Sequence, residues 1–296
     1  MARAWSGTQH VVSVRDGHPS FTVLELNHQP GVGSAVHVVS SQQDPVGAVA
    51  SDNLDAGLLT RLSQHYELSL VGMSACVGRP AQVVEARRRG VVGPGAVAGR
   101  FWVDRATHLV LRREVLDSAG AVTRSSAFVS LKMSAPVVPT ELPLPVRATG
   151  RRLDEAALEE LKQEGWPVIR EMPEGMALFE ARLHDETATE LLQLAYSDGL
   201  STMSLFVQRG QLAADPAGIA HRVGNGTVWV TSGSPERAVW SGGDHTWTLV
   251  SDAPSQTVAA ALEALPHVAS SRKDDGVPSR VWRGMSRVGR WLNPFD

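Results

Sequence analysis

The segment LLQLAYSDGLSTMSLFV, residues 191–207, predicts a β-hairpin. Apolar residues alternate with other residues on both sides of its Ser-Asp-Gly centre, which is the period of two that a half-buried strand requires. Asp198 can hydrogen-bond to the backbone two residues on, and Gly199 can adopt the positive φ of a tight turn. A nucleophilic role for Ser197 is the weaker interpretation, because no G-x-S-x-G elbow surrounds it. The segment therefore favours a sheet over a catalytic site.

Short apolar runs separated by Gly, Pro, Asn and Asp extend this pattern over residues 7–50 and 75–133 and over much of the chain after residue 166. Runs of this length and spacing indicate antiparallel sheet. Apolar residues at helical spacing predict three helices as well. The first lies within 51–68, with Ser51 and Asp55 as candidate caps and with Leu58, Leu59, Leu62 and Tyr66 on one side. The second lies within 151–165, from Asp154 to Gly165, and the third lies within 257–268.

A change of composition divides the chain. Prolines gather between Pro136 and Pro145, which favours an extended, semi-rigid path without ladder hydrogen bonds. A length of 296 residues fits two domains. The predicted boundaries are 1–134 for the first domain, 135–150 for the linker, 151–270 for the second domain and 271–296 for a basic amphipathic tail.

The tail RVWRGMSRVGRWLNPFD combines an apolar and a basic side at helical spacing. Its apolar residues are Val281, Met285, Val288 and Leu292, and its basic residues are Arg280, Arg283, Arg287 and Arg290. Such a segment can dock on the protein's own sheet, on an acidic partner or on an anionic membrane surface. Two glycines weaken it as a free helix, so docking is preferred over membrane insertion.

Motifs that carry chemistry are missing from the sequence. Ten histidines are spread singly and Cys76 is the one cysteine, so no metal-ligand spacing occurs. A net charge of -3 gives no general reason to expect nucleic-acid binding. We predict no catalytic residue, no metal and no cofactor, although an active site assembled from distant residues stays open. No run of about 18 apolar residues and no export leader is present. The sequence passes from Met1 almost directly into the strand-like AWSGTQHVVSV, so we expect that an export signal or membrane anchor, if there was one, has been removed.

Five short motifs, in this order and spacing, resemble the RseB/MucB family of extracytoplasmic sigma-E regulatory proteins, in an actinobacterial style. They are WSGTQHV (5–11), GRPAQVVEARR (78–88), FWVDRATHLVLRREVLDSAGAV (101–122), GWPV (165–168) and LAYSDGLSTMSLFV (194–207). The terminal WLNPF is similar to actinobacterial members as well. The resemblance covers nearly the whole chain.

The resemblance implies an α+β fold, mainly antiparallel β: a LolA-like open, unclosed barrel with helices, followed by a smaller mixed domain. It implies a non-enzymatic protein of the periplasm or cell envelope. Such a protein binds the extracytoplasmic domain of an anti-sigma factor, protects it from regulated proteolysis and releases it when a lipid or lipopeptide ligand signals envelope damage. A lipid or lipoprotein carrier with the same barrel is the alternative function.

The same resemblance suggests site residues. An unclosed barrel with apolar walls can accept an acyl chain, with a gain of about 0.8 kcal/mol per buried methylene. Ligand and partner would weaken each other by one coupling energy if they favour different domain angles. The candidate ligand contacts are Trp102, Leu109 and Leu111, and the candidate partner contacts are Tyr196, Leu200 and Phe206.

Overall fold

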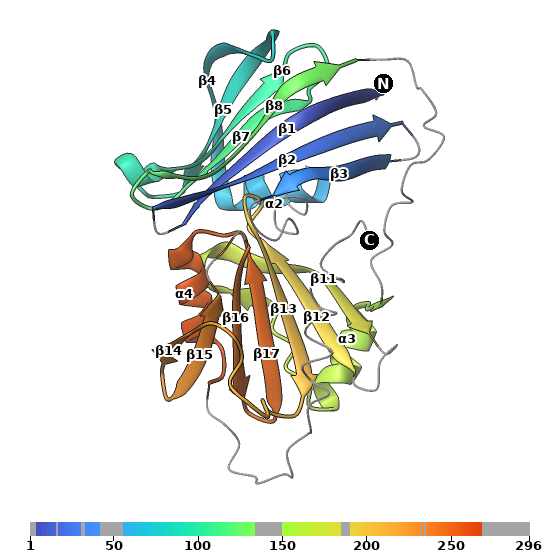
Figure 1. The fold of residues 1–296 in the computed structure, drawn as a ribbon, viewed down its shortest axis with the longest axis vertical. Coiled ribbons are helices and arrows are strands. Elements are labelled where there is room, and N and C mark those ends of the chain that lie inside the picture. Colours follow the sequence, from blue (N-terminus) through green and yellow to red (C-terminus); the bar gives the residue numbers. More distant parts are fainter. Residues whose placement is uncertain are drawn as a thin grey trace. The chain divides into compact units, whose positions relative to one another are not determined.

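A computed structural model describes residues 4–15, 17–30, 33–41, 56–133, 150–184, 190–231, 233 and 235–267. Contacts divide the described residues into two compact units, one within 4–133 and one within 150–267. Each unit is built on one antiparallel sheet (Figure 1). None of the described helices is long and apolar enough to cross a membrane.

The first unit contains an eight-stranded sheet in the order β3-β2-β1-β8-β7-β6-β5-β4. Its strands are β1 (Trp5–Arg15), β2 (His18–Gln29), β3 (Gly33–Ser41), β4 (Tyr66–Cys76), β5 (Arg79–Arg88), β6 (Val97–Asp104), β7 (Val110–Leu116) and β8 (Val122–Lys132). Helix α2 (Ala56–His65) leads directly into β4, and the 3-10 turn η1 (Pro94–Ala96) precedes β6. Among the described strands β3 and β4 each pair on one side only, so the sheet is open.

An apolar cluster forms on one face of this sheet, which we call the inner face. Its buried members are Val11, Leu24, Leu26, Val36 and Phe128. Trp5 packs beside them, with its ring 5.6 Å from that of His28 and 5.4 Å from that of Phe128. A Cβ at position 7 would lie 2.4 Å from the Ser130 carbonyl oxygen, so only glycine fits there. The WSG motif at the start of the chain is therefore a packing motif.

The helix predicted within 51–68 is α2, but it ends at His65. Tyr66 is the first residue of β4 and is not helical, so the prediction was wrong at that end. Strand β4 as a whole was not predicted. The candidate caps Ser51 and Asp55 lie outside the described residues.

The second unit contains a nine-stranded sheet in the order β10-β11-β12-β13-β17-β16-β15-β14, with β9 paired to β11. Its strands are β9 (Arg151–Arg152), β10 (Glu171–Met172), β11 (Met176–His184), β12 (Leu191–Ser197), β13 (Thr202–Arg209), β14 (Ile219–Val223), β15 (Gly226–Thr231), β16 (Glu236–Gly242) and β17 (His245–Ser251). Two helices, α3 (Glu155–Gln163) and α4 (Ser255–Ala264), and the turn η2 (Pro173–Gly175) complete it.

Both helices of the second unit pack on one apolar core. Leu158 and Leu161 of α3 and Val258 and Leu262 of α4 belong to the same buried cluster as the sheet residues. Asp154 caps α3 as predicted, because its Oδ1 accepts a hydrogen bond from the Ala157 amide at 2.9 Å. The predictions of α3 and α4 are therefore confirmed.

The hairpin predicted from residues 191–207 is confirmed as β12 and β13. In its turn, Asp198 Oδ1 accepts hydrogen bonds from the amides of Leu200 and Ser201, and Gly199 has a φ of 94°. The prediction of half-buried strands was wrong. Both faces of the hairpin are buried. Leu192, Leu194 and Leu205 lie in the core that includes the helices. On the opposite face, Leu191 and Phe206 are only 1% and 3% exposed.

The predicted fold class is confirmed: both sheets are antiparallel, helices are few, and the first sheet is unclosed. Most of the predicted linker, residues 135–149, and the whole predicted tail, 271–296, lie outside the described residues. The exact domain boundaries and the amphipathic helix of the tail therefore stay predictions.

Candidate apolar binding site on the first sheet

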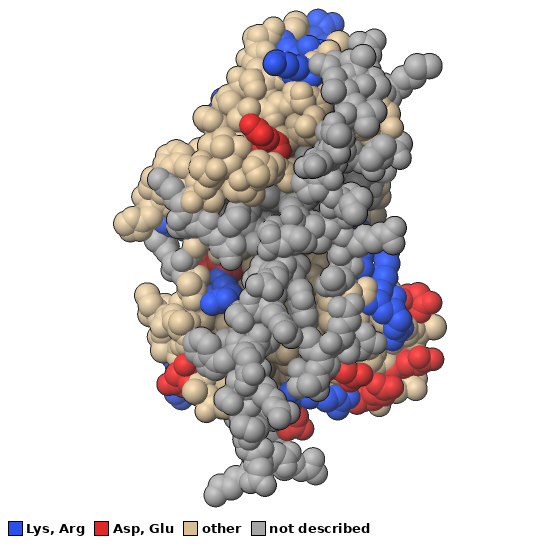
Figure 2. All heavy atoms as spheres, turned by 45° about the vertical axis from the view of Figure 1, so that its right-hand side comes forward, with Lys and Arg blue, Asp and Glu red and all other residues tan. Residues whose placement is uncertain are grey.

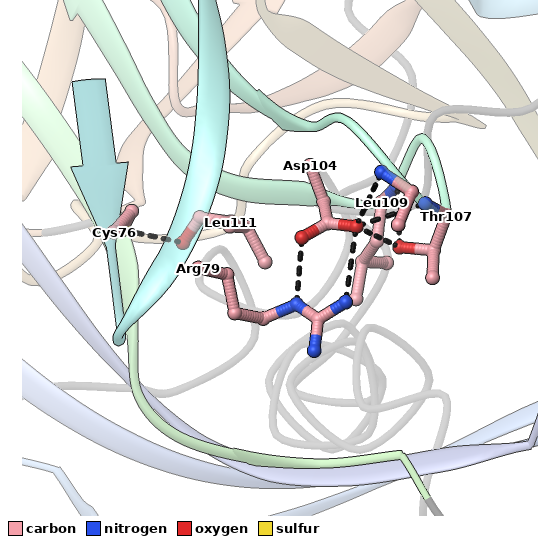
Figure 3. Close-up of polar contacts among 7 residues, drawn as sticks. Cys76, Arg79, Asp104, Thr107, Leu109 and Leu111 are labelled. Carbon is pink, nitrogen blue, oxygen red and sulfur yellow. Dashed lines mark hydrogen bonds and ion pairs between the residues drawn. The ribbon is translucent and has the colours of Figure 1, made fainter.

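The end of the β4–β5 hairpin is fixed by an ion pair that joins two of the sequence motifs. Arg79, the first residue of β5, donates from Nε to Asp104 Oδ2 at 2.6 Å and from Nη2 to Asp104 Oδ1 at 3.1 Å (Figure 3). Asp104 is the last residue of β6 and is 1% exposed. Its Oδ1 also accepts hydrogen bonds from the amides of Ala106 and Thr107, so one carboxylate orders the β6–β7 turn as well.

The environment of Asp104 favours its charged form. The hydrogen bond from Arg79 is the largest cause that lowers the pKa of Asp104, to about 2, with a further contribution from Thr107. A carboxylate that is paired with a guanidinium group and accepts several hydrogen bonds is held in its charged form, which suits it to order the surrounding chain.

Cys76 attaches the last residue of β4 to the same framework. Its Sγ donates to the Leu111 carbonyl oxygen at 3.8 Å, and burial raises the pKa of its thiol (Figure 3). A thiol with a raised pKa is a poor nucleophile at neutral pH. Cys76 and Arg79 together hold the end of β4 against β6 and β7.

Strand β4 itself carries an exposed apolar surface. Four of its side chains, which we call the β4 strip, are large, apolar and well exposed: Leu68 at 43%, Leu70 at 61%, Val71 at 50% and Met73 at 55%. Figure 2 shows that much of the described surface of the first unit in that view is uncharged. An exposed apolar patch of a few hundred Å² is common on a monomer and is often functional.

Strand register places three members of the strip on the inner face. Leu68, Leu70 and Met73 pair with Ala86, Val84 and Gln82 of β5, which alternate along one face. Pairing across the sheet continues that face from Leu70 through Val84, Phe101, Arg113 and Ser126 to Val11 of the apolar cluster. Val71 is the extra residue at a bulge between Leu70 and Gly72. The strip therefore forms the part of the inner face that lies at the open β4 edge of the sheet.

The middle of the inner face is polar. Arg113 and Arg124 are each 5% exposed, and both make interactions with other groups of the chain. The two arginines thus separate the cluster around Val11 from a second apolar region, which runs from Phe101 through Val84 to the β4 strip. Of these two regions, the second is the one open to solvent, at the strip.

The three predicted ligand contacts do not share one surface. Leu109 packs against the inner-face cluster, and Leu111 is fully buried. Trp102 pairs with Arg112, whose guanidinium carbon lies 4.6 Å from the centre of the Trp102 ring. Trp102 follows the inner-face residue Phe101, so it lies on the outer face. One ligand on the inner face would not touch Trp102, and the ligand role of all three residues stays a prediction.

The predicted partner contacts are all buried within the second unit. Tyr196 is fully buried, and Leu200 and Phe206 are 2% and 3% exposed. Tyr196 donates its hydroxyl hydrogen to the Ile169 carbonyl oxygen at 2.9 Å, and burial raises the pKa of its phenol. These positions give the three residues a packing role in the structure, and their contact with a partner stays a prediction.

The sequence interpretation missed the β4 strip. The signal that would find it is the alternation of Leu68 and Leu70 with Glu67 and Ser69, which has the period of a strand. No group of three or more His, Cys, Asp or Glu side chains suited to a metal ion occurs within the described parts of the two units.

Comparison with known proteins identifies the first unit. Residues 10–146 match the family model of the MucB/RseB N-terminal domain. No curated protein matches the chain. Among solved structures, MucB in complex with MucA(peri) is 22% identical, with 90% of this chain and 94% of that chain covered and a TM-score of 0.46. The Pseudomonas aeruginosa MucA/MucB complex is 21% identical, with 91% and 94% covered and a TM-score of 0.48. A LolA superfamily protein from Nitrosomonas europaea is 8% identical, with 46% and 88% covered and a TM-score of 0.20.

Proposed function

Because its MucB/RseB N-terminal domain makes the chain a member of the RseB/MucB family, we propose that it is a non-enzymatic regulator that binds the extracytoplasmic domain of an anti-sigma factor. Binding shields that domain from regulated proteolysis, and a lipid-like ligand of a damaged envelope reverses it. The protein acts outside the cytoplasm. The match of residues 10–146 to the family domain is the observation that carries this proposal.

The β4 strip supports the ligand part of the proposal. Leu70 and Met73 are 61% and 55% exposed to solvent. An acyl chain laid on them removes apolar surface from both molecules, at about 25 cal/mol per Å². Since the sheet is open at β4, a chain can reach the strip without any strand separating.

Release follows from linkage. If the ligand lowers the affinity for the anti-sigma domain, that domain lowers the affinity for the ligand by the same factor. A coupling of tenfold corresponds to about 1.4 kcal/mol, which the burial of two further methylenes supplies.

The test uses the purified full chain and the extracytoplasmic domain of the anti-sigma factor encoded in the same genome. We expect saturable binding by titration calorimetry, slower cleavage of the anti-sigma domain by its site-one protease, and weaker binding when a long-chain fatty acid is added. Failure of the two proteins to bind would overturn the proposal.

A lipid or lipoprotein carrier is the second candidate, favoured by the same exposed strip on an open sheet. A carrier retains lipid through purification and does not need the anti-sigma domain. Lipid extraction and mass spectrometry of the purified protein, next to the binding titration, separate the two functions. Copurified lipid without anti-sigma binding would favour the carrier.

A further inference from the structure

We infer that β4 is a docking edge, to which an extended segment of the partner protein adds as a further strand of the first sheet. The inference rests on the function proposed above and specifies how the partner is held. It goes beyond apolar contact, because it assigns the backbone of β4 a role in binding.

The length and position of β4 suit this role. The strand has eleven residues and, within the described part of the chain, pairs with β5 alone. An end strand leaves a row of backbone N–H and C=O groups without ladder partners, which a further strand can use. The strand ends at Cys76, whose thiol donates to the Leu111 carbonyl oxygen, and Arg79, three residues further on, is held by its ion pair with Asp104. These two contacts hold the end of β4 in place. A preformed edge lowers the entropy cost of binding.

Strand β4 lacks the usual protection of an exposed edge. Natural edge strands carry lysines, prolines or inward-pointing charges, or are very short. Residues 66–76 contain no Lys, Arg or Pro, and their one charged residue, Glu67, lies 3.7 Å from Arg89. The second sheet offers a contrast, since its end strand β14 has five residues, and His221 and Arg222 on it are exposed. An unprotected edge strand promotes aggregation, so its presence here favours a role in binding another protein segment.

The side chains of β4 define the chemistry of the segment. Leu68, Leu70 and Met73 offer apolar contacts on the inner face, whereas Ser69 and Gly72 offer small, uncharged positions on the other face. Directly opposed side chains on neighbouring strands interact most strongly. Charge complementarity therefore favours a neutral segment in which apolar residues alternate with small polar ones, because β4 presents no unpaired charge that would attract an acidic or basic peptide.

A second copy of the chain is the other candidate occupant, and the available area argues against it. Four half-exposed side chains amount to an apolar patch of a few hundred Å², of the size that monomers commonly carry. Pairing two such patches falls short of the roughly 1,200 Å² of a stable interface. A segment tethered to a folded domain needs less area, because contacts elsewhere raise its effective concentration.

The experiment compares the wild type, Leu70→Lys/Met73→Lys and a control, Phe21→Lys, in titrations with the purified extracytoplasmic domain of the anti-sigma factor from the same genome. Phe21 is 48% exposed but lies on β2, which is paired on both sides. We expect the double variant to lose affinity about tenfold, as edge lysines are expected to block strand addition, and the control to stay near the wild type. Amide hydrogen exchange of the wild-type complex is expected to slow across residues 68–74.

Each outcome decides something different. Absence of binding by the wild type overturns both the proposed function and the docking edge. Binding that is equal in all three proteins, or complex formation without slower exchange in 68–74, overturns the docking edge alone. A concentration-dependent dimer of the free wild type that dissociates in the double variant identifies a second copy as the occupant and also overturns it.

Discussion

Arg79 and Asp104 form a bidentate ion pair, with 2.6 Å between Nε and Oδ2 and 3.1 Å between Nη2 and Oδ1. The two residues are 25 positions apart and belong to two different sequence motifs, GRPAQVVEARR and FWVDRATHLVL. Planar guanidinium and carboxylate groups match each other in this geometry. The pair therefore fastens the start of β5 to the end of β6, next to the β4 edge that the proposed function uses.

Replacing Asp104 with Asn removes the charge that pairs with Arg79. Since that pairing lowers the pKa of Asp104 to about 2, the folded protein binds this proton less tightly than the unfolded chain does. The stabilisation is complete above about pH 4 and is lost as the pH falls toward 2. We expect Asp104→Asn to lower the free energy of unfolding at pH 7 by about 2 kcal/mol. Urea denaturation at successive pH values would show the difference from the wild type shrinking below pH 4.

Arg79→Gln provides the control for this ion pair. If the two residues act together, Arg79→Gln/Asp104→Asn loses less stability than the sum of the losses in the two single variants. Additive losses would mean that the turn hydrogen bonds of Asp104, and not Arg79, carry its contribution.

Tyr196→Phe tests the hydroxyl that reaches across the second unit. The Tyr196 hydroxyl donates to the Ile169 carbonyl oxygen at 2.9 Å, and Tyr196 is fully buried. Its loss leaves that carbonyl without this donor, so we expect about 1 kcal/mol less stability. Thermal unfolding followed by calorimetry measures this. An unchanged transition would show that water replaces the hydroxyl.

The local parts of this fold were predictable because short-range chemistry decides them. Asp198 and Gly199 specify a turn by their own backbone preferences, and the structure forms it. Asp154 specifies the start of α3 in the same way, by capping the Ala157 amide. Each of these signals acts within four residues, where a single sequence carries enough information.

Strand β4 was not predictable in the same way. Leu62 and Tyr66 have helical spacing, and no turn residue separates α2 from β4, since His65 ends one and Tyr66 begins the other. The face of Trp102 was also hidden, because it depends on pairing with β5 and β7. At β4 the helical spacing of Leu62 and Tyr66 competes with the strand-like alternation of residues 67–70. The face of Trp102 is decided by long-range register, which a hydrophobic pattern alone does not contain.

Three buried tryptophans of the second unit should respond differently to replacement by Phe. Trp240 Nε1 donates to the Pro266 carbonyl oxygen and Trp247 Nε1 to the Gly242 carbonyl oxygen, both at 2.8 Å. Trp166 Nε1 makes no hydrogen bond with the described residues. We therefore expect Trp166→Phe to cost about 1 kcal/mol less than either of the other two variants, as measured by chemical denaturation. An equal cost in all three would mean that lost ring volume outweighs the hydrogen bond.

The β4 strip should bind acyl chains with an affinity that depends on their length. Each methylene that leaves water contributes about 0.8 kcal/mol, so affinity is expected to rise about fourfold per methylene between decanoic and tetradecanoic acid. Displacement of a fluorescent fatty acid from the full chain measures the series. Because Leu70 and Met73 are 61% and 55% exposed, Leu70→Lys/Met73→Lys should fold normally, bind every member more weakly and flatten the dependence on length. Phe21→Lys is the matched control, since Phe21 is 48% exposed and lies on β2, which is paired on both sides and is distant from β4 in the strand order. If the double variant keeps the steep dependence of the wild type, the acyl chain binds elsewhere on the protein.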